Sequence, residues 1–289
     1  MTDATVRPLL AAAAARLRAA GIASPELDAA LLLAAVLGVR RHQLALGPDA
    51  PVDADAVARY DTLLARRVRR EPISHVLGRA EFWSLEFEVT ADTLAPRPET
   101  EGLVERALRE LRALEAPVVV DVGTGTGCIA VVLARELPAA TVHAVDIHAE
   151  TLEVARRNAV RHGVAARVRL HLGDLLAPLA GHVAPGSVDA VLSNPPYVRH
   201  DEVGDVDPEV LHEPRRAVFV DGEPAALYAR IATEALPYLR AGGLLACELP
   251  GDEPAPITAA VGAVRGYAIE AVLPDLAGHP RVLVARRAP

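Results

Sequence analysis

The chain has 289 residues, of which 51% are hydrophobic and 24% are charged, a balance that excludes a largely disordered protein and predicts about two domains at roughly 150 residues each. The net charge of −8 is uneven, because residues 1–80 hold 11 arginines against 8 acidic residues and the remainder holds 19 against 30, which argues against direct nucleic-acid binding. No apolar run approaches the roughly 18–20 residues of a bilayer span, and the N-terminus lacks the basic start of a signal peptide, so we expect a cytoplasmic protein without membrane segments.

The first predicted region is helical and covers residues 7–70. A serine–proline pair at residues 24–25 is typical of an N-cap followed by a first-turn proline, and the apolar residues after it recur at helical spacing. Another helix is expected over 53–68. Its four arginines within 66–70 are interpreted as a solvated helix face, with a contact to nucleic acid or protein as the alternative. We expect a small helical domain over residues 1–75.

The periodicity changes after Pro72. Residues 81–89 alternate apolar and polar side chains over most of their length, as a half-buried strand does. The same stretch contains the single tryptophan and two of the three phenylalanines. We expect a β-hairpin linker over residues 76–95 that joins two domains.

Strands and helices alternate from Pro117 onward. Strands are expected at 117–122, 141–146, 167–172, 188–193, 243–248, 268–273 and 281–286, and helices at 127–137, 149–162, 223–240 and 253–264. Alternation of this kind predicts a mostly parallel sheet with helices on both faces. The fold class is therefore α/β, in a domain over residues 96–289.

A glycine-rich turn follows the first of these strands and runs directly into a helix at Cys128. A strand, a glycine turn and a helix N-terminus form a cradle for a nucleotide-like ligand, because the backbone can approach the ligand closely and its amides face it. The next strand ends at Asp146, where a carboxylate can accept both hydroxyls of a ribose. The residues of the turn are Gly123, Thr124, Gly125, Thr126 and Gly127.

Two details favour S-adenosylmethionine over NAD as the ligand. The glycine spacing is Gly-x-Gly-x-Gly instead of Gly-x-Gly-x-x-Gly. Asp121, just before the turn, would repel a pyrophosphate but suits an ammonium group. Asp174, after the third strand, is placed to contact the adenine, with a helix N-cap as the alternative. A turn of this kind can also bind a dinucleotide or simply connect a strand to a helix.

The most specific pattern is Ser193-Asn194-Pro195-Pro196-Tyr197, at the end of an apolar strand. Two prolines end the strand and remove two backbone donors. The carbonyl of Pro195 can therefore project into a site as an acceptor, together with the side-chain oxygen of Asn194. Tyr197 can supply a flat surface for a planar group.

Two acceptors beside an aromatic ring fit a planar –NH2 group. An amide or aromatic amine is a poor nucleophile because its lone pair is delocalised, and holding both N–H bonds orients that lone pair toward a methyl carbon. Positioning and electrostatics would then provide most of the rate. We therefore expect Asn194, Pro195 and Tyr197 to be catalytic, with an ordinary proline turn as the alternative.

Other kinds of catalytic site find little support in the composition. All 30 Lys and Arg residues are arginine, so there is no P-loop lysine and no Schiff-base lysine. The two cysteines, Cys128 and Cys247, lie in apolar runs where small core residues are expected, and they exclude a disulfide framework. The ten histidines are scattered, and we expect no metal site.

These motifs together resemble the amino-methylating branch of the class I S-adenosylmethionine-dependent methyltransferases. Three further stretches are similar to the HemK/PrmC family of peptide chain release factor glutamine methyltransferases. They are residues 71–78 with the Glu-Phe-Trp at 81–83, the Pro-Arg-Pro-Glu-Thr-Glu at 96–101, and the Asp-Leu-Ala-Gly at 275–278 with Arg281. The helical segment is similar as well, so the resemblance covers nearly the whole chain.

The resemblance implies a Rossmann-like class I methyltransferase domain with a mostly parallel seven-stranded sheet, preceded by a small helical domain and a β-hairpin linker. It implies transfer of a methyl group from S-adenosyl-L-methionine to the glutamine amide (N5) of the Gly-Gly-Gln motif in class I release factors, which the helical domain would recognise. The implied cofactor residues are Gly123, Thr124, Gly125, Thr126, Gly127, Asp146, Asp174, Leu175 and Asn194. The implied substrate residues are Asn194, Pro195, Pro196 and Tyr197.

Two stretches depart from the family pattern. The family tends to have Glu-Ile-Gly and then Gln where this chain has Glu-Leu-Pro-Gly-Asp at 248–252, and residues 217–222 also differ. The departures concern loop details. The alternatives that stay open are a glutamine methyltransferase acting on a ribosomal protein, an adenine-N6 nucleic-acid methyltransferase, and a non-catalytic cofactor-binding module. No heptad seam or repeat is present, so we expect a monomer.

Overall fold

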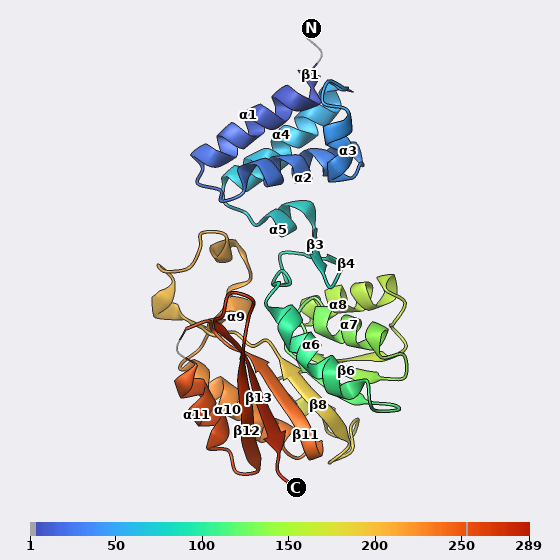
Figure 1. Cartoon of the computed structure of the whole chain (residues 1–289), viewed down its shortest axis with the longest axis vertical. Helices are drawn as coiled ribbons and strands as arrows, with labels where there is room; N and C mark the ends of the chain where they lie inside the picture. Colours follow the sequence, from blue (N-terminus) through green and yellow to red (C-terminus); the bar gives the residue numbers. More distant parts are fainter. Residues whose placement is uncertain (1–3, 253) are drawn as a thin grey trace. The chain divides into compact units, whose positions relative to one another are not determined.

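The computed structural model describes residues 4–252 and 254–289, which form two compact units (Figure 1). The N-terminal unit comprises the chain up to Arg79 and the segment Asp207–His212, and the C-terminal unit comprises Ala80–Val206 and Glu213–Pro289. The sequence predicts boundaries at residues 75 and 95, whereas the compact units divide after Arg79, so nearly the whole hairpin lies in the C-terminal unit. Every helix within the described residues falls short of the length and apolar character that crossing a bilayer requires.

The N-terminal unit is built from helices, as the apolar spacing predicts. The second helix begins at Pro25 and is followed by Gly38, whose φ of 66° is left-handed and favours glycine. The fourth is capped by Asp53, whose carboxylate accepts a hydrogen bond from a backbone N–H three residues later. The buried faces meet around Leu17 and Leu64. The elements are α1 (Val6–Ala19), α2 (Pro25–Leu37), α3 (Arg41–Leu46), α4 (Ala54–Val68) and α5 (Ile73–Leu77), with β1 (Ala4–Thr5) antiparallel to β2 (Pro51–Val52).

Three of the four arginines in residues 66–70 form ion pairs within this unit, and for Arg67 and Arg70 the interpretation as a solvated helix face is wrong. The Arg67 side chain is only 7% exposed, and it donates to Asp28 at 2.7 Å and to Glu209 at 2.9 Å. Arg70 donates to the second oxygen of Glu209 at 2.5 Å. Because Glu209 lies in the segment Asp207–His212, these pairs hold that distant segment in the N-terminal unit.

The predicted alternation over residues 81–89 corresponds to a hairpin of β3 (Arg79–Phe82) and β4 (Leu85–Glu88). Trp83 and Ser84 form its turn with φ values of 54° and 57°, the left-handed conformation that tight hairpin turns require. Its two phenylalanines are fully buried and belong to the core of the C-terminal unit. The apolar face of the hairpin therefore packs against the core of the C-terminal unit.

The C-terminal unit contains the seven-stranded, mostly parallel sheet that the sequence predicts, in the order β12-β13-β11-β8-β5-β6-β7. Strands β11, β8, β5, β6 and β7 run parallel, whereas β13 is antiparallel to both β11 and β12. Each of the seven predicted segments forms a strand. They are β5 (Val118–Val122), β6 (Thr141–Asp146), β7 (Val168–Leu172), β8 (Val188–Ser193), β11 (Leu239–Glu248), β12 (Tyr267–Pro274) and β13 (Pro280–Arg287).

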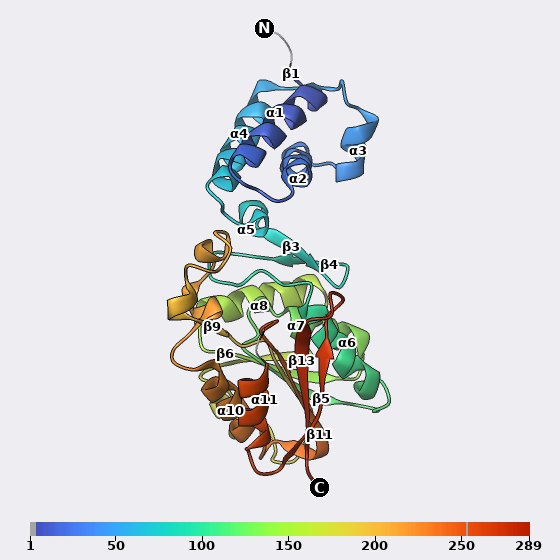
Figure 2. The same cartoon turned by 60° about the vertical axis from the view of Figure 1, so that its left-hand side comes forward.

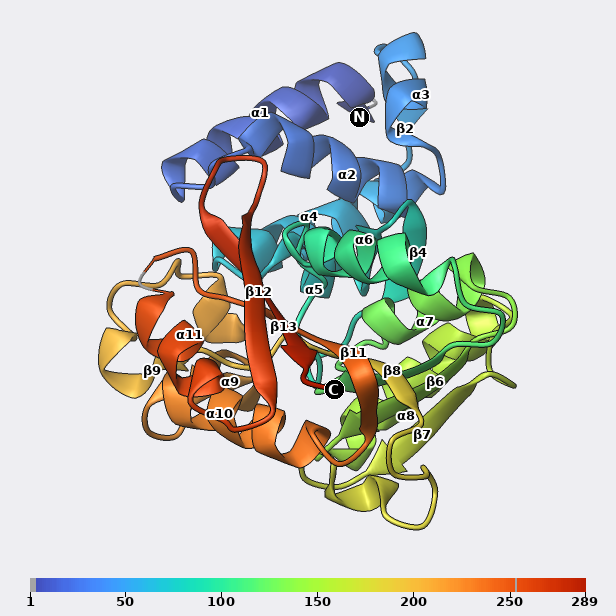
Figure 3. The same ribbon diagram turned by 60° about the horizontal axis from the view of Figure 1, so that its bottom comes forward.

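Helices cover both faces of this sheet, as Figures 2 and 3 show. Successive residues of a strand point to opposite faces, so Val119 packs in one apolar cluster with α6 and α7, and Val120 packs in another with α10 and α11. The helices are α6 (Thr100–Leu111), α7 (Cys128–Glu136), α8 (Ala149–Arg161), α10 (Pro224–Ala235) and α11 (Ala255–Gly262). Shorter elements are α9 (Arg215–Val218), β9 (Val198–Arg199) and β10 (Phe219–Val220), the last two forming a parallel pair. The predicted α/β fold is confirmed.

Candidate active site

A cavity opens at the carboxyl ends of the parallel strands β5, β6, β7 and β8. In sheets of this kind, ligands bind at this edge because the loops that follow the strands converge there. The lining residues lie mainly in residues 92–97, 122–126, 128–129, 145–148, 173–175 and 193–196. The cavity thus joins the glycine turn, the acid at the end of β6 and the Asn-Pro-Pro motif, which the sequence analysis assigns to one site.

The glycine loop presents its backbone to this cavity. Gly123 and Gly125 have φ values of 70° and 56°, which L side chains rarely adopt. A Cβ added at either position would meet nothing within 4 Å, so the space beside them is open. Thr124 and Thr126 also line the cavity, and both are buried. Four of the five predicted loop residues therefore face the site.

Gly127 serves a different purpose. It is not one of the described residues that line the cavity, and it lies immediately before α7 with a φ of 79°. A Cβ at this position would lie 3.1 Å from the Cβ of Ala155 and 3.3 Å from its Cα. Gly127 therefore permits close packing of α7 against α8. Contact between Gly127 and a cofactor stays a prediction.

Asp121 lies beneath the loop and is fully buried. Its Oδ2 accepts hydrogen bonds from the Thr124 hydroxyl at 2.6 Å and from the Ala130 N–H at 3.2 Å. Its Oδ1 is buried without a hydrogen-bond partner among the described residues, and burial raises the pKa of this carboxyl to about 7. Asp121 is not among the described residues that line the cavity, so its unpaired oxygen acts from behind the loop, where negative charge fits a ligand that carries positive charge, as S-adenosylmethionine does.

Asp146 ends β6 in the cavity wall. Its two carboxylate oxygens accept backbone N–H groups, Oδ2 from Gly125 at 3.1 Å and Oδ1 from His148 at 3.1 Å. These bonds fix the carboxylate and leave further lone pairs for a ligand hydroxyl. Burial is the main cause that raises the pKa of Asp146. The predicted ribose acceptor thus lies beside the predicted loop.

The turn after β7 is strained where it lines the cavity. Leu175 has a φ of 44°, a left-handed conformation that costs roughly 1–3 kcal/mol for a residue other than glycine. Asp174 accepts a hydrogen bond from Arg230 of α10 at 2.6 Å, so α10 holds its carboxylate. Strain of this kind is typical of a turn that is shaped for a ligand.

The Asn-Pro-Pro sequence forms another part of the wall. β8 ends at Ser193, whose hydroxyl donates to the carbonyl of Val122 at 2.8 Å and so joins the ends of β8 and β5. Asn194 and the two prolines after it line the cavity. The Nδ2 of Asn194 donates to the Oγ1 of Thr100 at 3.1 Å. No described residue donates to its Oδ1, so this acceptor remains open to a ligand.

Tyr197 is placed differently from its neighbours. It is not among the described residues that line the cavity, and its ring packs against the apolar cluster that includes Tyr228 and Ile231 of α10. Burial raises the pKa of Tyr197 to about 12. The prediction that its ring stacks on a substrate therefore stays a prediction.

The segment 92–97 is a part of the wall of which the sequence singled out only residues 96 and 97, within the stretch 96–101 that resembles the family. The segment is held by the buried Glu213. Its carboxylate accepts a hydrogen bond from the Ala95 N–H at 3.3 Å and forms an ion pair with Arg97. At the start of the segment, Thr151 of α8 donates to the carbonyl of Asp92 at 3.0 Å. Glu213 has no local signal, since its partners lie more than 100 positions away in the chain.

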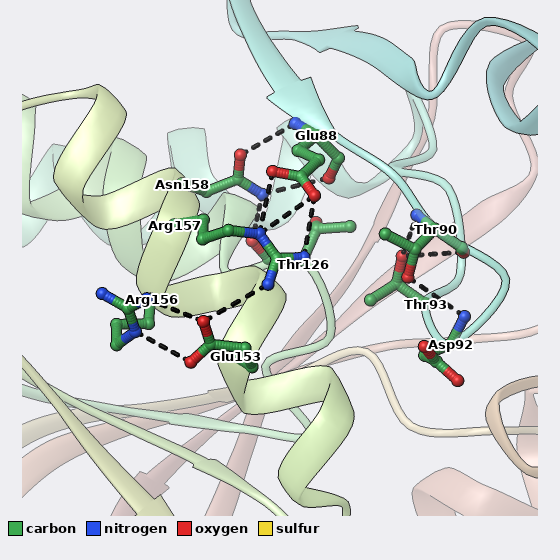
Figure 4. A network of polar contacts seen from close by, with 9 residues as sticks. All are labelled: Glu88, Thr90, Asp92, Thr93, Thr126, Glu153, Arg156, Arg157 and Asn158. Atoms are coloured by element: carbon green, nitrogen blue, oxygen red, sulfur yellow. Dashed lines mark hydrogen bonds and ion pairs between the residues drawn. The ribbon is translucent and has the colours of Figure 1, made fainter.

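Asn158 of α8 connects the hairpin to the glycine loop, as Figure 4 shows. Its Oδ1 accepts from the Glu88 N–H at 2.8 Å, and its Nδ2 donates to the Glu88 carbonyl at 3.1 Å and to the Thr126 carbonyl at 2.9 Å. Arg157 adds an ion pair with the Glu88 side chain at 2.7 Å. The fully buried Asn158 thus holds the loop from behind, and its sequence position in an ordinary helical pattern does not reveal this.

The cavity offers a backbone cradle and acceptors instead of a nucleophile. Cys128 lines it, but burial raises the pKa of the thiol to about 12, so the thiolate is scarcely populated near neutral pH. Within residues 4–252 and 254–289, no group of three or more His, Cys, Asp or Glu side chains is arranged to hold a metal ion. The glycine loop, Asp121 and Asp146 fit S-adenosylmethionine.

The sheet order and the position of this cradle are those of a Rossmann-like fold, and the family comparisons make this chain a methyltransferase that uses S-adenosylmethionine. Solved structures share this fold. A methyltransferase from Pyrococcus furiosus matches with a TM-score of 0.52 and 20% identity over 79% of this chain and 100% of that chain. The catalytic domain of hMettl16, in complex with a MAT2A 3'UTR hairpin, matches with a TM-score of 0.54 and 15% identity over 84% of this chain and 85% of that chain.

Comparison with family models and curated proteins identifies the particular family. The PrmC N-terminal domain matches residues 8–78, and the methyltransferase small domain matches residues 103–245. A release factor glutamine methyltransferase of Cereibacter sphaeroides is 43% identical over 96% of each chain. Its counterpart in Deinococcus radiodurans is 40% identical over 98% of this chain and 99% of its own. This chain therefore belongs to the release factor glutamine methyltransferase family, as the resemblance implied.

Proposed function

We propose that this methyltransferase transfers a methyl group from S-adenosylmethionine to the side-chain amide nitrogen (N5) of the glutamine in the Gly-Gly-Gln motif of class I peptide chain release factors. One observation carries the proposal. The open Oδ1 acceptor of Asn194 and the glycine loop line the same cavity, so an acceptor for an amide N–H lies beside a cradle for the methyl donor. The names of the relatives supply the release factor as the substrate.

The cofactor contacts follow from the cavity wall. Gly123, Thr124, Gly125 and Thr126 offer backbone amides to the donor, with Gly127 behind them, and Asp146 accepts the ribose hydroxyls. Asp174 and Leu175 border the adenine. When bound, S-adenosylmethionine supplies an electrophilic methyl group on a sulfonium that is a good leaving group.

The chain's own residues orient the nucleophile. The Asn194 Oδ1 and the Pro195 carbonyl accept the two N–H bonds of the glutamine amide, and Pro196 lines the same cavity. Contact of the Tyr197 ring with that amide stays a prediction. Because both N–H bonds are held, the nitrogen lone pair is directed at the methyl carbon, and the barrier falls through positioning and preorganised electrostatics. The nitrogen loses its surplus proton to solvent after transfer.

The rest of the chain suits a protein substrate in the cytoplasm. We assign recognition of the release factor to the helical N-terminal unit, and we expect the enzyme to act as a monomer. Direct nucleic-acid binding is disfavoured, because residues 81–289 hold 19 arginines against 30 acidic side chains. This balance makes an adenine-N6 activity the weaker alternative.

A transfer assay with labelled S-adenosylmethionine tests the proposal. Purified class I release factor, a ribosomal protein fraction and adenine-containing oligonucleotides are offered separately at equal concentration. Label should enter the release factor and require Asn194, so the Asn194→Ala variant serves as the matched control. Label in the ribosomal proteins or the oligonucleotides, with none in the release factor, would overturn the proposed substrate.

A further inference from the structure

A line of hydrogen bonds connects the cavity to a buried carboxylate behind it. Glu248, at the end of β11, is 1% exposed, and Thr100, at the start of α6, is 2% exposed. The Thr100 hydroxyl donates to the Glu248 Oε2 at 2.6 Å, and it accepts from the Asn194 Nδ2 at 3.1 Å. Glu248 is not among the described residues that line the cavity, and its hydrogen-bonded connection to the site runs through Thr100.

The chemistry of these three groups gives the line a direction. An ionised carboxylate can only accept, so the Thr100 hydroxyl must give its proton to Glu248. The Thr100 oxygen then has only lone pairs to offer, and Asn194 must turn its –NH2 group toward it. The other end of the planar amide, Oδ1, consequently points away from Thr100. If the side-chain amide of Asn194 were rotated by 180°, its –NH2 group would face the substrate N–H groups, which need an acceptor.

We propose that Thr100 and Glu248 are positioning residues that keep the Oδ1 of Asn194 directed at the amide group of the substrate. The proposal rests on the proposed function in one respect, the identity of that substrate group. Neither residue touches the reacting atoms. Thr100 sets the direction of the Asn194 side chain, and Glu248 sets the direction of the Thr100 hydroxyl.

The surroundings of Glu248 hold its position and set the pH above which it is an acceptor only. Its backbone carbonyl accepts the Tyr228 hydroxyl at 2.5 Å, which fixes the end of β11. Burial raises the pKa of Glu248 to about 7, and the negative charge of Glu99 also raises it. The hydrogen bond from Thr100 and the positive charges of Arg281 and Arg97 lower it, but they do not outweigh burial. A mildly alkaline assay therefore keeps this carboxyl ionised.

Two substitutions at residue 100 give opposite outcomes for a positioning role and a packing role. Thr100→Val keeps the shape and loses the hydroxyl, whereas Thr100→Ser keeps the hydroxyl and loses a methyl group. We expect kcat for release factor methylation to fall about 10- to 100-fold in Thr100→Val and less than about 3-fold in Thr100→Ser, with KM for the release factor within about 3-fold of wild type in both. A high kcat in Thr100→Val together with a low kcat in Thr100→Ser would contradict the proposal. A kcat that falls in proportion to the loss of Tm in both variants would contradict it as well.

A second variant and a second measurement keep the test independent of folding and of the substrate. Glu248→Gln can donate as well as accept, so the direction of the line is lost, and we expect kcat to fall about 3- to 10-fold. In the free protein, NMR exchange of the Asn194 side-chain N–H2 should be slow in wild type and Thr100→Ser and faster in Thr100→Val. Unchanged exchange in Thr100→Val would overturn the positioning role, whereas a wild type that shows slow exchange but no methylation of release factor would overturn only the proposed function.

Discussion

The two walls of the cavity use different parts of the chain to prepare for a ligand. On the glycine wall, residues 121–127, the stretch 122–126 lines the cavity with backbone whose shape follows from glycines that alternate with threonines. On the asparagine wall, the key atom is one side-chain oxygen, Oδ1 of Asn194, and its direction depends on Thr100 and Glu248, which are separated from each other by 148 positions. The shape of the glycine wall can therefore be predicted from a local sequence motif. The direction of the Asn194 side chain on the asparagine wall depends on residues that only the tertiary fold brings together.

The largest expected effect is on the asparagine wall. Asn194→Ala removes the acceptor for the amide N–H, and because this acceptor acts on the reacting nitrogen, kcat/KM for release factor methylation should fall about 1,000-fold. Thermal unfolding and steady-state kinetics of the same preparations check the prediction. A variant with wild-type Tm and activity within about 10-fold of wild type would show that Asn194 does not hold the nucleophile.

Substitutions in the glycine wall should have two different effects, one mainly on stability and one on cofactor binding. Gly127→Ala brings a Cβ to 3.1 Å from Ala155 at a φ of 79°, so we expect a loss of about 2–4 kcal/mol in the free energy of unfolding. Gly125→Ala has open space around its Cβ, so it should cost about 1–2 kcal/mol and weaken binding of S-adenosylmethionine about 10-fold.

Urea unfolding and calorimetric titration with S-adenosylmethionine measure both quantities in the two glycine variants. The division of roles fails if Gly127→Ala binds the cofactor poorly at unchanged stability. It also fails if Gly125→Ala loses stability without losing affinity.

The buried charge of Asp121, in the glycine wall, should lower the free energy of unfolding at high pH. Its folded pKa of about 7 lies above its ordinary value of 3.8, so the stability contributed by its protonation is complete below 3.8 and is lost as the pH rises through about 7. Asp121→Asn removes this loss and should raise the free energy of unfolding at pH 8 by about 1–3 kcal/mol, with little or no gain at pH 4.

Urea unfolding of wild type and Asp121→Asn at the two pH values tests this sign. The same variant should bind S-adenosylmethionine more weakly, because it lacks the negative charge that suits a positively charged ligand. Equal gains in stability at both pH values would show that the charge of Asp121 is not the cause.

The smallest effect is expected behind the asparagine wall. Tyr228→Phe removes the hydroxyl that binds the Glu248 carbonyl, so the end of β11 loses one hydrogen bond worth about 1 kcal/mol. Because Glu248 acts on the substrate only through two further groups, we expect kcat to fall about 2- to 3-fold. A loss beyond about 30-fold would indicate that Tyr228 acts more directly than the structure shows.

The difference between the walls also explains how much of the molecule the sequence predicts. The seven strands follow from local apolar runs, and the glycine loop, Asp146 and Asn194 stand directly after such runs, so their meeting at one edge of the sheet is predictable. Periodicity describes single elements, and it does not tell which buried polar groups will meet. Glu213 is therefore identified only by the fold, through Ala95 and Arg97.

The wrong interpretation has the same origin. Arg67 stands in a run of arginines, a pattern typical of a solvated face, yet it is buried because Asp28 and Glu209 supply two carboxylates from distant parts of the chain. Gly127 and Tyr197 belong to motifs that indicate ligand binding, but packing against α8 and α10 places both outside the described cavity lining.

The central claim is methyl transfer to an amide nitrogen held by Asn194, and tandem mass spectrometry of release factor tests it most directly. The factor is incubated with S-adenosylmethionine and either wild-type enzyme or Asn194→Ala, then digested and sequenced across the Gly-Gly-Gln motif. We predict one added methyl group on the glutamine side chain with wild type and none with the variant. A methyl group on any other residue, or on the same glutamine with Asn194→Ala at the wild-type rate, would contradict the account.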